Sequence, residues 1–226
     1  MDRVLVFDAD DTLWENNILF ERVIDDFVAW LAHPTLDEGA IRAVLRDVEA
    51  ANIVVHGYGS RVFLRSLGEC FERLHARPVT DRERQEIDEL AVALMEDRIE
   101  LVPEVAETLD QLGGRYRLAL LTKGDPEEQQ AKLDVSGLGR HFGSVHIVTE
   151  KDVDTYRGLT RRLALNPETT WMIGNSPKSD ILPARRAGWN AVFIPNEHTW
   201  EFEHEELPPD ERVLQLRAFT DLLDHF

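Results

Sequence analysis

Carboxylates and a threonine follow the first apolar run of the chain. The run is residues 3–7, and Asp8, Asp10, Asp11 and Thr12 come directly after it. The Asp8 carboxylate can attack phosphorus and form an aspartyl-phosphate, which divides a very slow hydrolysis into two displacements. Asp10, two residues on, can protonate the leaving oxygen and then take a proton from the attacking water. Asp11 and Thr12 either belong to the same group of functional residues or simply cap the following turn.

Polar residues also follow three later strand-like runs. Thr122 follows the second run, Lys151 the third, and Asn175 and Asp180 the fourth. Helical stretches separate these runs, and this alternation predicts an α/β fold with a doubly wound parallel sheet. Ligands bind beyond the carboxyl ends of the strands in such sheets, so we expect these residues to converge on Asp8.

Hydrophobic spacing predicts where the elements lie. Residues 18–32 carry an apolar stripe with the 3.6-residue period of a helix, and glycines mark several helix ends. The expected strands are 3–7, 116–121, 145–148, 170–173 and 191–194, and the expected helices are 18–32, 36–52, 60–77, 81–99, 103–112, 125–135, 152–165 and 178–187. The tail from about residue 213 is expected to add a strand and a last helix.

Four motifs resemble those of a known family. In order, they are Asp8-Ala-Asp10-Asp11-Thr12, Thr122, Lys151 and the stretch GNSPKSD at 174–180. Together they resemble the motifs of the haloacid dehalogenase-like superfamily. The resemblance implies a Rossmann-like catalytic core of residues 1–13 and 101–226. It also implies a helical cap of the first type, inserted at residues 14–100.

The resemblance further implies a magnesium-dependent phosphatase. Mg²⁺ is a hard cation that prefers oxygen ligands, and it would offset the repulsion between clustered carboxylates and a phosphoryl group. Its ligands would be the Asp8 carboxylate, the Asp10 main-chain carbonyl, and groups from Asn175 and Asp180. Thr122 and Lys151 would hold the phosphoryl oxygens, and Lys151 would neutralise charge in the transition state.

The chain departs from the family pattern at two motifs. The fourth commonly begins Gly-Asp but here reads Gly174-Asn175, and an amide oxygen brings no charge, which shifts metal binding towards Asp180. The third lacks the frequent Lys-Pro pair. Lys123, beside Thr122, is therefore a rival to Lys151 as the phosphate-binding lysine.

Other activities remain open at the level of sequence. A haloacid dehalogenase of the same superfamily generally lacks the second aspartate of motif one, so Asp10 favours phosphate chemistry. A phosphomutase uses the same residues and differs in the group that accepts the phosphoryl. A phospho-acceptor signalling domain shares the residue types, but it is shorter and phosphorylated at an aspartate after a later strand.

Composition restricts the partners. The formal charge of −18, from 43 acidic and 25 basic residues, disfavours nucleic acid. No apolar run reaches the roughly 20 residues that span a bilayer, and the N-terminus lacks a signal-peptide pattern. We interpret Cys70 as a small buried hydrophobic residue and His56 as a structural residue. The histidines do not have the spacing of a zinc site. We expect a soluble cytoplasmic monomer or homodimer that acts on a small phosphorylated metabolite, with Tyr58 and Arg61 as possible substrate contacts.

Overall fold

The computed structural model describes residues 3–95 and 99–226. The chain divides into two compact units, Met1–Asn17 with Arg98–Phe226, and Ile18–Asp97. Trp14 belongs to the first unit, because its backbone forms bridges with Asp10 and Leu101. The helical segment therefore begins a few residues later than position 14, and its role as a cap stays a prediction.

The first unit is built on one sheet of six parallel strands. Their order across the sheet is β3-β2-β1-β4-β5-β6, with the first strand near the centre. The strands are β1 (Val4–Phe7), β2 (Arg117–Lys123), β3 (Ser144–Val148), β4 (Thr170–Gly174), β5 (Asn190–Phe193) and β6 (Val213–Gln215). This topology confirms the predicted doubly wound fold class.

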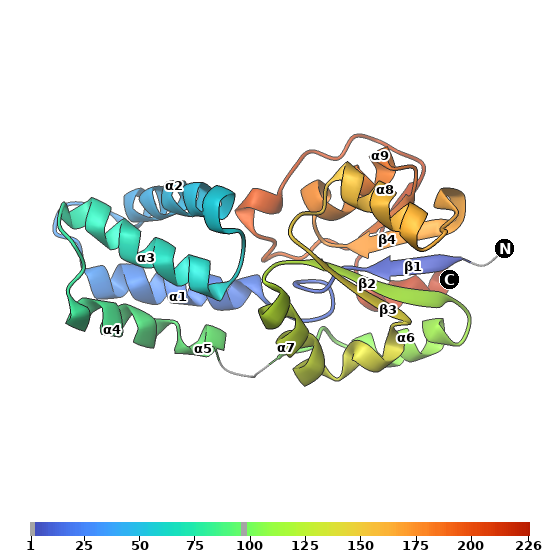
Figure 1. Cartoon of the computed structure of the whole chain (residues 1–226), viewed down its shortest axis with the longest axis horizontal. Coiled ribbons are helices and arrows are strands. Elements are labelled where there is room, and N and C mark those ends of the chain that lie inside the picture. Colours follow the sequence, from blue (N-terminus) through green and yellow to red (C-terminus); the bar gives the residue numbers. More distant parts are fainter. Residues whose placement is uncertain (1–2, 96–98) are drawn as a thin grey trace. The chain divides into compact units, whose positions relative to one another are not determined.

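Helices cover both faces of this sheet. They are α6 (Val105–Gly113), α7 (Pro126–Ser136), α8 (Val153–Arg162) and α9 (Leu182–Arg186). In Figure 1, α8 and α9 lie over one face, and α6 and α7 lie over the other. The helix expected at 178–187 begins instead with a π-helical turn, Pro177–Ile181, and the last helix is a 3₁₀ helix, Phe219–Asp224.

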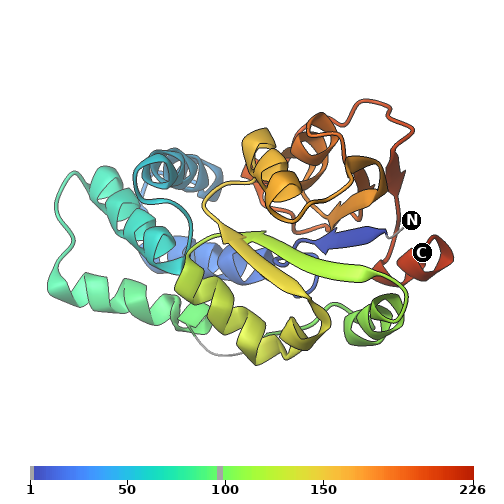
Figure 2. The ribbon, with the colours of Figure 1, turned by 45° about the vertical axis from the view of Figure 1, so that its right-hand side comes forward.

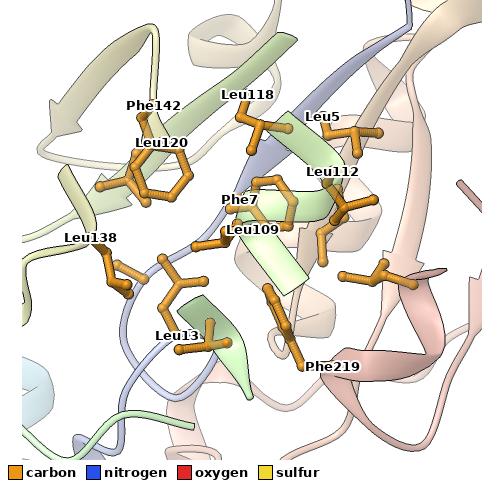
Figure 3. Close-up of a cluster of buried hydrophobic side chains, with 14 of the residues drawn as sticks. Leu5, Phe7, Leu13, Leu109, Leu112, Leu118, Leu120, Leu138, Phe142 and Phe219 are labelled. Carbon is orange, nitrogen blue, oxygen red and sulfur yellow. The ribbon is translucent and has the colours of Figure 1, made fainter. Parts of the chain in front are cut away.

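The alternating side chains of β1 join two apolar layers. Leu5 and Phe7 lie in the layer with α6, and Val4 and Val6 lie in the layer with α8 and α9. Figure 3 shows Phe7 among the leucines of β2 and α6. Burial of each large side chain of this kind contributes about 1.5–3 kcal/mol. The 3₁₀ helix Phe219–Asp224 and the C-terminal Phe226 pack in the apolar layer that contains α6. Figure 2 shows this end of the chain beside α6. Both layers fix β1, and therefore the loop that follows it.

The second unit is helical and has its own apolar core. Its helices are α1 (Asn17–Leu31), α2 (Glu38–His56), α3 (Ser60–His75), α4 (Asp81–Leu90) and α5 (Val92–Met95). Thr80 caps the N-terminus of α4 and forms a capping box with Glu83. The helix expected at 81–99 is divided at Ala91, and residues 96–98 of that expectation lie outside the described part. Among the helices described, none has the length and apolarity needed to cross a membrane.

Candidate active site

The predicted residues come together at the carboxyl edge of the sheet. Phe7 pairs in register with Leu120 of β2 and Ile173 of β4, near the carboxyl ends of these parallel strands. The Asp8 N–H donates to the Ile173 carbonyl oxygen over 2.9 Å, which extends β1 by one residue. The loop after β1 therefore begins next to the loop after β4, which carries Asn175.

A lysine joins two buried carboxylates at this edge. The Lys151 Nζ donates to Asp8 Oδ1, and it lies 2.7 Å from Asp180 Oδ1. Asp8 is 7% exposed, Lys151 is 3% exposed, and Asp180 is fully buried. The other Asp8 oxygen, Oδ2, lies 3.0 Å from the Thr12 hydroxyl. Residues from three different strand ends thus form one cluster with an excess negative charge.

Burial shapes the proton affinity of the cluster. Burial raises the pKa of Asp8 to about 7, and the nearby Asp180 charge adds to this while Lys151 opposes it. The pKa of Asp180 is also raised by burial. Burial acts to lower the pKa of Lys151, but the two carboxylates outweigh it and raise that pKa. Lys151 therefore remains charged, and a further cation beside the carboxylates would be favoured.

The loop after β4 folds tightly around Asp180. The Asp180 Oδ2 accepts a hydrogen bond from the Ser176 N–H over 3.0 Å. A Cβ at Gly174 would lie 2.2 Å from this same oxygen, so only glycine fits there. Asn175 points its Oδ1 to the Thr12 hydroxyl, 3.2 Å away. Thr12 thus lies between an oxygen of Asp8 and an oxygen of Asn175.

These oxygens fit a hard cation. Within residues 3–95 and 99–226, no three or more His, Cys, Asp and Glu residues form a group that could hold a metal ion. The predicted magnesium ligands, however, include the Asn175 amide oxygen and the Asp10 main-chain carbonyl oxygen. Neither atom belongs to a His, Cys, Asp or Glu side chain. Asp8 and Asn175 share the Thr12 hydroxyl, and Asp8 and Asp180 share the Lys151 ammonium. Carboxylate and amide oxygens gathered in this way are the donors that Mg²⁺ prefers.

Asp10 has a separate set of partners. Its Oδ1 accepts from the Trp14 Nε1 over 2.7 Å, and its Oδ2 accepts from the Gln129 Nε2 over 2.8 Å. The Lys132 Nζ lies 3.2 Å and 3.3 Å from the two oxygens. Burial acts to lower the pKa of Lys132, but Asp10 and Glu128 outweigh it and raise that pKa. Three donors thus hold the Asp10 carboxylate in one orientation.

The second motif is linked to Asp10 through a glutamine. The Thr122 hydroxyl lies 3.3 Å from the Gln129 Oε1, and Gln129 donates to Asp10 with its other amide atom. The neighbouring Lys123 contacts Glu203 and the loop after β4. Its Nζ contacts Glu203 Oε1 at 2.5 Å and the Ser179 hydroxyl at 2.9 Å. Lys151, the other candidate lysine, donates directly to Asp8.

Asp11 holds the turn rather than the cluster. Its Oδ1 accepts the N–H groups of Asn16 and Asn17, both over 2.9 Å, as the capping interpretation expects. Asp11 has a φ of 59°, a left-handed conformation that Asp and Asn adopt more readily than most residues. Burial raises the pKa of Asp11 to about 7. Thr12, by contrast, bonds to cluster residues.

Sequence reasoning missed five residues around the cluster. Gln129 and Lys132 lie three positions apart on α7, so they share a face, and lysine is rare in this chain. These two facts could have drawn attention to them. Trp14, Thr199 and Glu203 had no comparable local signal, because their contacts form only in the folded chain.

Comparisons with known proteins identify the family and agree with the fold. A family model described as haloacid dehalogenase-like hydrolase matches residues 3–188. A phosphoserine phosphatase from Thermus thermophilus is 28% identical over 95% of this chain and 96% of its own. A glyceraldehyde 3-phosphate phosphatase from Methanopyrus kandleri is 26% identical over 99% and 97%. The crystal structure of a haloacid dehalogenase-like family hydrolase from Xanthomonas campestris superposes with a TM-score of 0.87 at 28% identity, over 99% of this chain and 90% of that one.

Proposed function

The chain belongs to the haloacid dehalogenase-like hydrolase family, and we propose that it hydrolyses small phosphate monoesters with Asp8 as nucleophile and Mg²⁺ as cofactor. The observation that carries the proposal is the burial and the fixed orientation of the Asp8 carboxylate at the end of β1. Its carboxylate is buried and held at one oxygen by Lys151 and near the other by Thr12. A nucleophile oriented in this way needs little rearrangement to attack.

In the first half-reaction, an Asp8 oxygen attacks phosphorus and the bond from phosphorus to the leaving oxygen breaks. Asp10 donates a proton to that oxygen, so the product departs as a neutral alcohol. Trp14, Gln129 and Lys132 hold the Asp10 side chain for this transfer. Lys151 supplies positive charge to the phosphoryl oxygens, and Thr122 supplies a hydroxyl at the neighbouring strand end.

In the second half-reaction, Asp10 is a base. It takes a proton from water, and the water oxygen attacks the phosphorus of the aspartyl-phosphate. The bond between phosphorus and the Asp8 oxygen breaks, which releases inorganic phosphate and restores the Asp8 carboxylate. Asp10 is then protonated for the next turnover.

Mg²⁺ would be held by the Asp8 carboxylate, the Asp10 main-chain carbonyl and the Asn175 amide oxygen, with Asp180 beside them. When bound, it offsets the repulsion between these carboxylates and the phosphoryl group. Asp180 is more deeply buried than Asp8, and it accepts a backbone N–H of its own loop, from Ser176, as well as the Lys151 ammonium, so we assign it mainly to holding Lys151 and the loop. The direct ligand of the fourth motif is then Asn175.

The substrate is proposed to be a small phosphorylated metabolite. Two relatives that cover nearly all of this chain carry the names phosphoserine phosphatase and glyceraldehyde 3-phosphate phosphatase. We propose that the helical unit of residues 18–97 serves as the cap that selects among such compounds. The cytoplasmic location and the oligomeric state of the protein stay predictions.

A panel assay tests this proposal. Purified full-length protein with Mg²⁺ is incubated with phosphoserine, glyceraldehyde 3-phosphate and other phosphorylated metabolites, and released phosphate is measured. Haloacids are the control substrates, with halide release as the readout. We expect phosphate release that disappears in an Asp8→Asn variant that remains folded. Halide release without phosphatase activity would instead identify a dehalogenase, and transfer of phosphate to a second sugar would identify a phosphomutase.

A further inference from the structure

We propose that Thr199 is a positioning residue that turns the carbonyl oxygen of Asn175 towards the cation site. Thr199 lies on the segment after β5, outside the four motifs. The inference rests on the proposed function, because it concerns how this chain binds the cation with an amide where the family commonly has a carboxylate.

The direction of two hydrogen bonds fixes the amide. The Thr199 Oγ1 lies 2.9 Å from the Asn196 carbonyl oxygen, which can only accept, so the single hydroxyl proton of Thr199 is used there. The Thr199 oxygen can then only accept from Asn175, and the Asn175 Nδ2 lies 2.9 Å from it. With its NH₂ group facing Thr199, Asn175 must direct Oδ1 the other way, to the Thr12 hydroxyl beside Asp8.

A reversed amide would be unfavourable at its contact with Thr199. Asn175 and Thr199 are both buried, at 5% and 8% exposed. Reversal would set the Asn175 oxygen against the Thr199 oxygen, two acceptors with no proton between them, unless Thr199 gave up its bond to Asn196. It would also turn an NH₂ group, which cannot bind a cation, towards Asp8.

The segment that carries Thr199 is anchored to the loop after β1. The Asn196 Nδ2 donates to the Asp11 carbonyl oxygen over 3.2 Å, and the Asn17 Nδ2 donates to the His198 carbonyl oxygen over 2.8 Å. Immediately before Thr199, these contacts tie the segment to the loop.

A second anchor lies further along the same segment. Glu203 accepts from the Ser176 hydroxyl at 2.5 Å and from Lys123. Burial acts to raise the pKa of Glu203, but Lys123 outweighs it and lowers that pKa, so Glu203 stays ionised and bound. The segment is thus attached on both sides of Thr199, and its hydroxyl has a fixed position.

This arrangement also explains the asparagine. A carboxylate at position 175 would offer Thr199 only an acceptor, while the Thr199 proton is already donated to Asn196. Asparagine satisfies Thr199 with its NH₂ group and keeps one oxygen for the cation. The departure from Gly-Asp is therefore matched by a hydroxyl that comes from elsewhere in the chain.

The experiment measures cation binding to the full-length protein without substrate. Isothermal titration with Mg²⁺, and electron paramagnetic resonance with Mn²⁺, give the dissociation constants. Thr199→Val removes the hydroxyl and keeps the shape, whereas Thr199→Ser keeps the hydroxyl. Residues that orient metal ligands typically contribute about 10- to 100-fold in affinity, so we expect Thr199→Val to weaken binding at least about tenfold. Thr199→Ser should stay close to the wild type.

Thr170→Val is the matched control. Thr170 is fully buried, and its hydroxyl donates to the Asn166 carbonyl oxygen over 2.8 Å, at the start of β4 and away from the site. It should lose stability as Thr199→Val does but bind Mg²⁺ with wild-type affinity. Equal weakening in both valine variants would overturn the inference, as would wild-type affinity in Thr199→Val.

A second measurement tests the route through the amide. Both oxygens of a carboxylate can bind a cation, so in an Asn175→Asp background we expect Thr199→Val to cause no further loss of affinity. A loss as large as in the wild-type background would contradict the inference. If the wild type itself bound neither cation, the metal in the proposed function would fail, which is a different outcome from failure of Thr199 alone.

Discussion

Replacement of Asp10 by asparagine should separate its catalytic role from its structural one. The structure allows the amide to be accommodated. The amide oxygen of the new side chain can still accept from the Trp14 Nε1, as the Asp10 carboxylate does. The new NH₂ group would face Gln129, which can reverse its own amide, accept with Oε1 and donate to the Thr122 hydroxyl. The main loss is the ion pair with Lys132.

That loss is moderate. The side chains of Asp10 and Lys132 are 23% and 16% exposed, so the pair lies between the surface pairs worth up to about 1 kcal/mol and the buried pairs whose disruption costs about 3–5 kcal/mol. Lys132 also keeps its 2.8 Å contact with the Asn16 oxygen. We expect a loss of about 1–3 kcal/mol in the free energy of unfolding. At about 2–4 °C per kcal/mol, the melting temperature should fall by less than about 12 °C.

The loss of activity should be larger and should depend on the leaving group. A general acid–base group typically contributes about 10²- to 10⁴-fold, which is about 2.7–5.5 kcal/mol of activation free energy. An alkyl phosphate, with its poor leaving group, should show this full effect. A nitrophenyl phosphate needs little protonation as its oxygen departs, so its first half-reaction should be much less impaired.

The assay is a rapid-quench comparison of both substrates in the wild type and the variant. We expect phosphoenzyme to accumulate in Asp10→Asn with nitrophenyl phosphate, because dephosphorylation still lacks its base. If Asp10→Asn hydrolysed an alkyl phosphate at the wild-type rate, Asp10 would be only a structural carboxylate.

Three further changes have defined outcomes. Asp8→Asn should abolish turnover with a wild-type circular dichroism spectrum, and retention of more than a few per cent of activity would remove Asp8 as nucleophile. EDTA should abolish phosphate release and excess Mg²⁺ should restore it, whereas full activity in chelator would exclude a metal-dependent reaction. Asp11→Asn should keep both backbone bonds of the turn and tolerate its positive φ. The pKa of Asp11 is raised from 3.8 to about 7, so ionisation of Asp11 destabilises the fold as pH rises between these values. Asparagine does not ionise. The melting temperature of Asp11→Asn minus that of the wild type should therefore increase from pH 4 to pH 8. An unchanged difference across this range would contradict it.

Local sequence patterns predicted the fold and the family because these patterns follow from the geometry of strands in a parallel sheet. The apolar run before Asp8 is buried on both faces, as a central parallel strand requires. Lys151 and Asp180 follow predicted strands, and parallel strands present their carboxyl ends at one edge of the sheet. Both residues were therefore predicted to lie beside Asp8, as they do. The family was predicted from four ordered motifs and is confirmed by the match over residues 3–188.

Contacts between distant segments could not be predicted in the same way. Thr199 meets Asn175 across 24 positions, and Gln129 meets Asp10 across 119. No periodicity in the sequence encodes which polar side chain faces which. Similarly, the apolar spacing of residues 81–99 continues through Ala91, where the chain leaves α4 and begins α5. Such breaks depend on tertiary packing, which can override local propensity.

The most direct test of the proposed chemistry is detection of phosphate on Asp8 during turnover. The protein is mixed with a substrate and Mg²⁺, quenched in acid within milliseconds, digested and examined by mass spectrometry. We expect a phosphate on the peptide that contains Asp8, located at that residue by fragmentation, and none in Asp8→Asn or in EDTA. Steady phosphate release with no phosphate on Asp8 at any time point, or phosphate on another residue, would contradict the assignment of Asp8 as nucleophile.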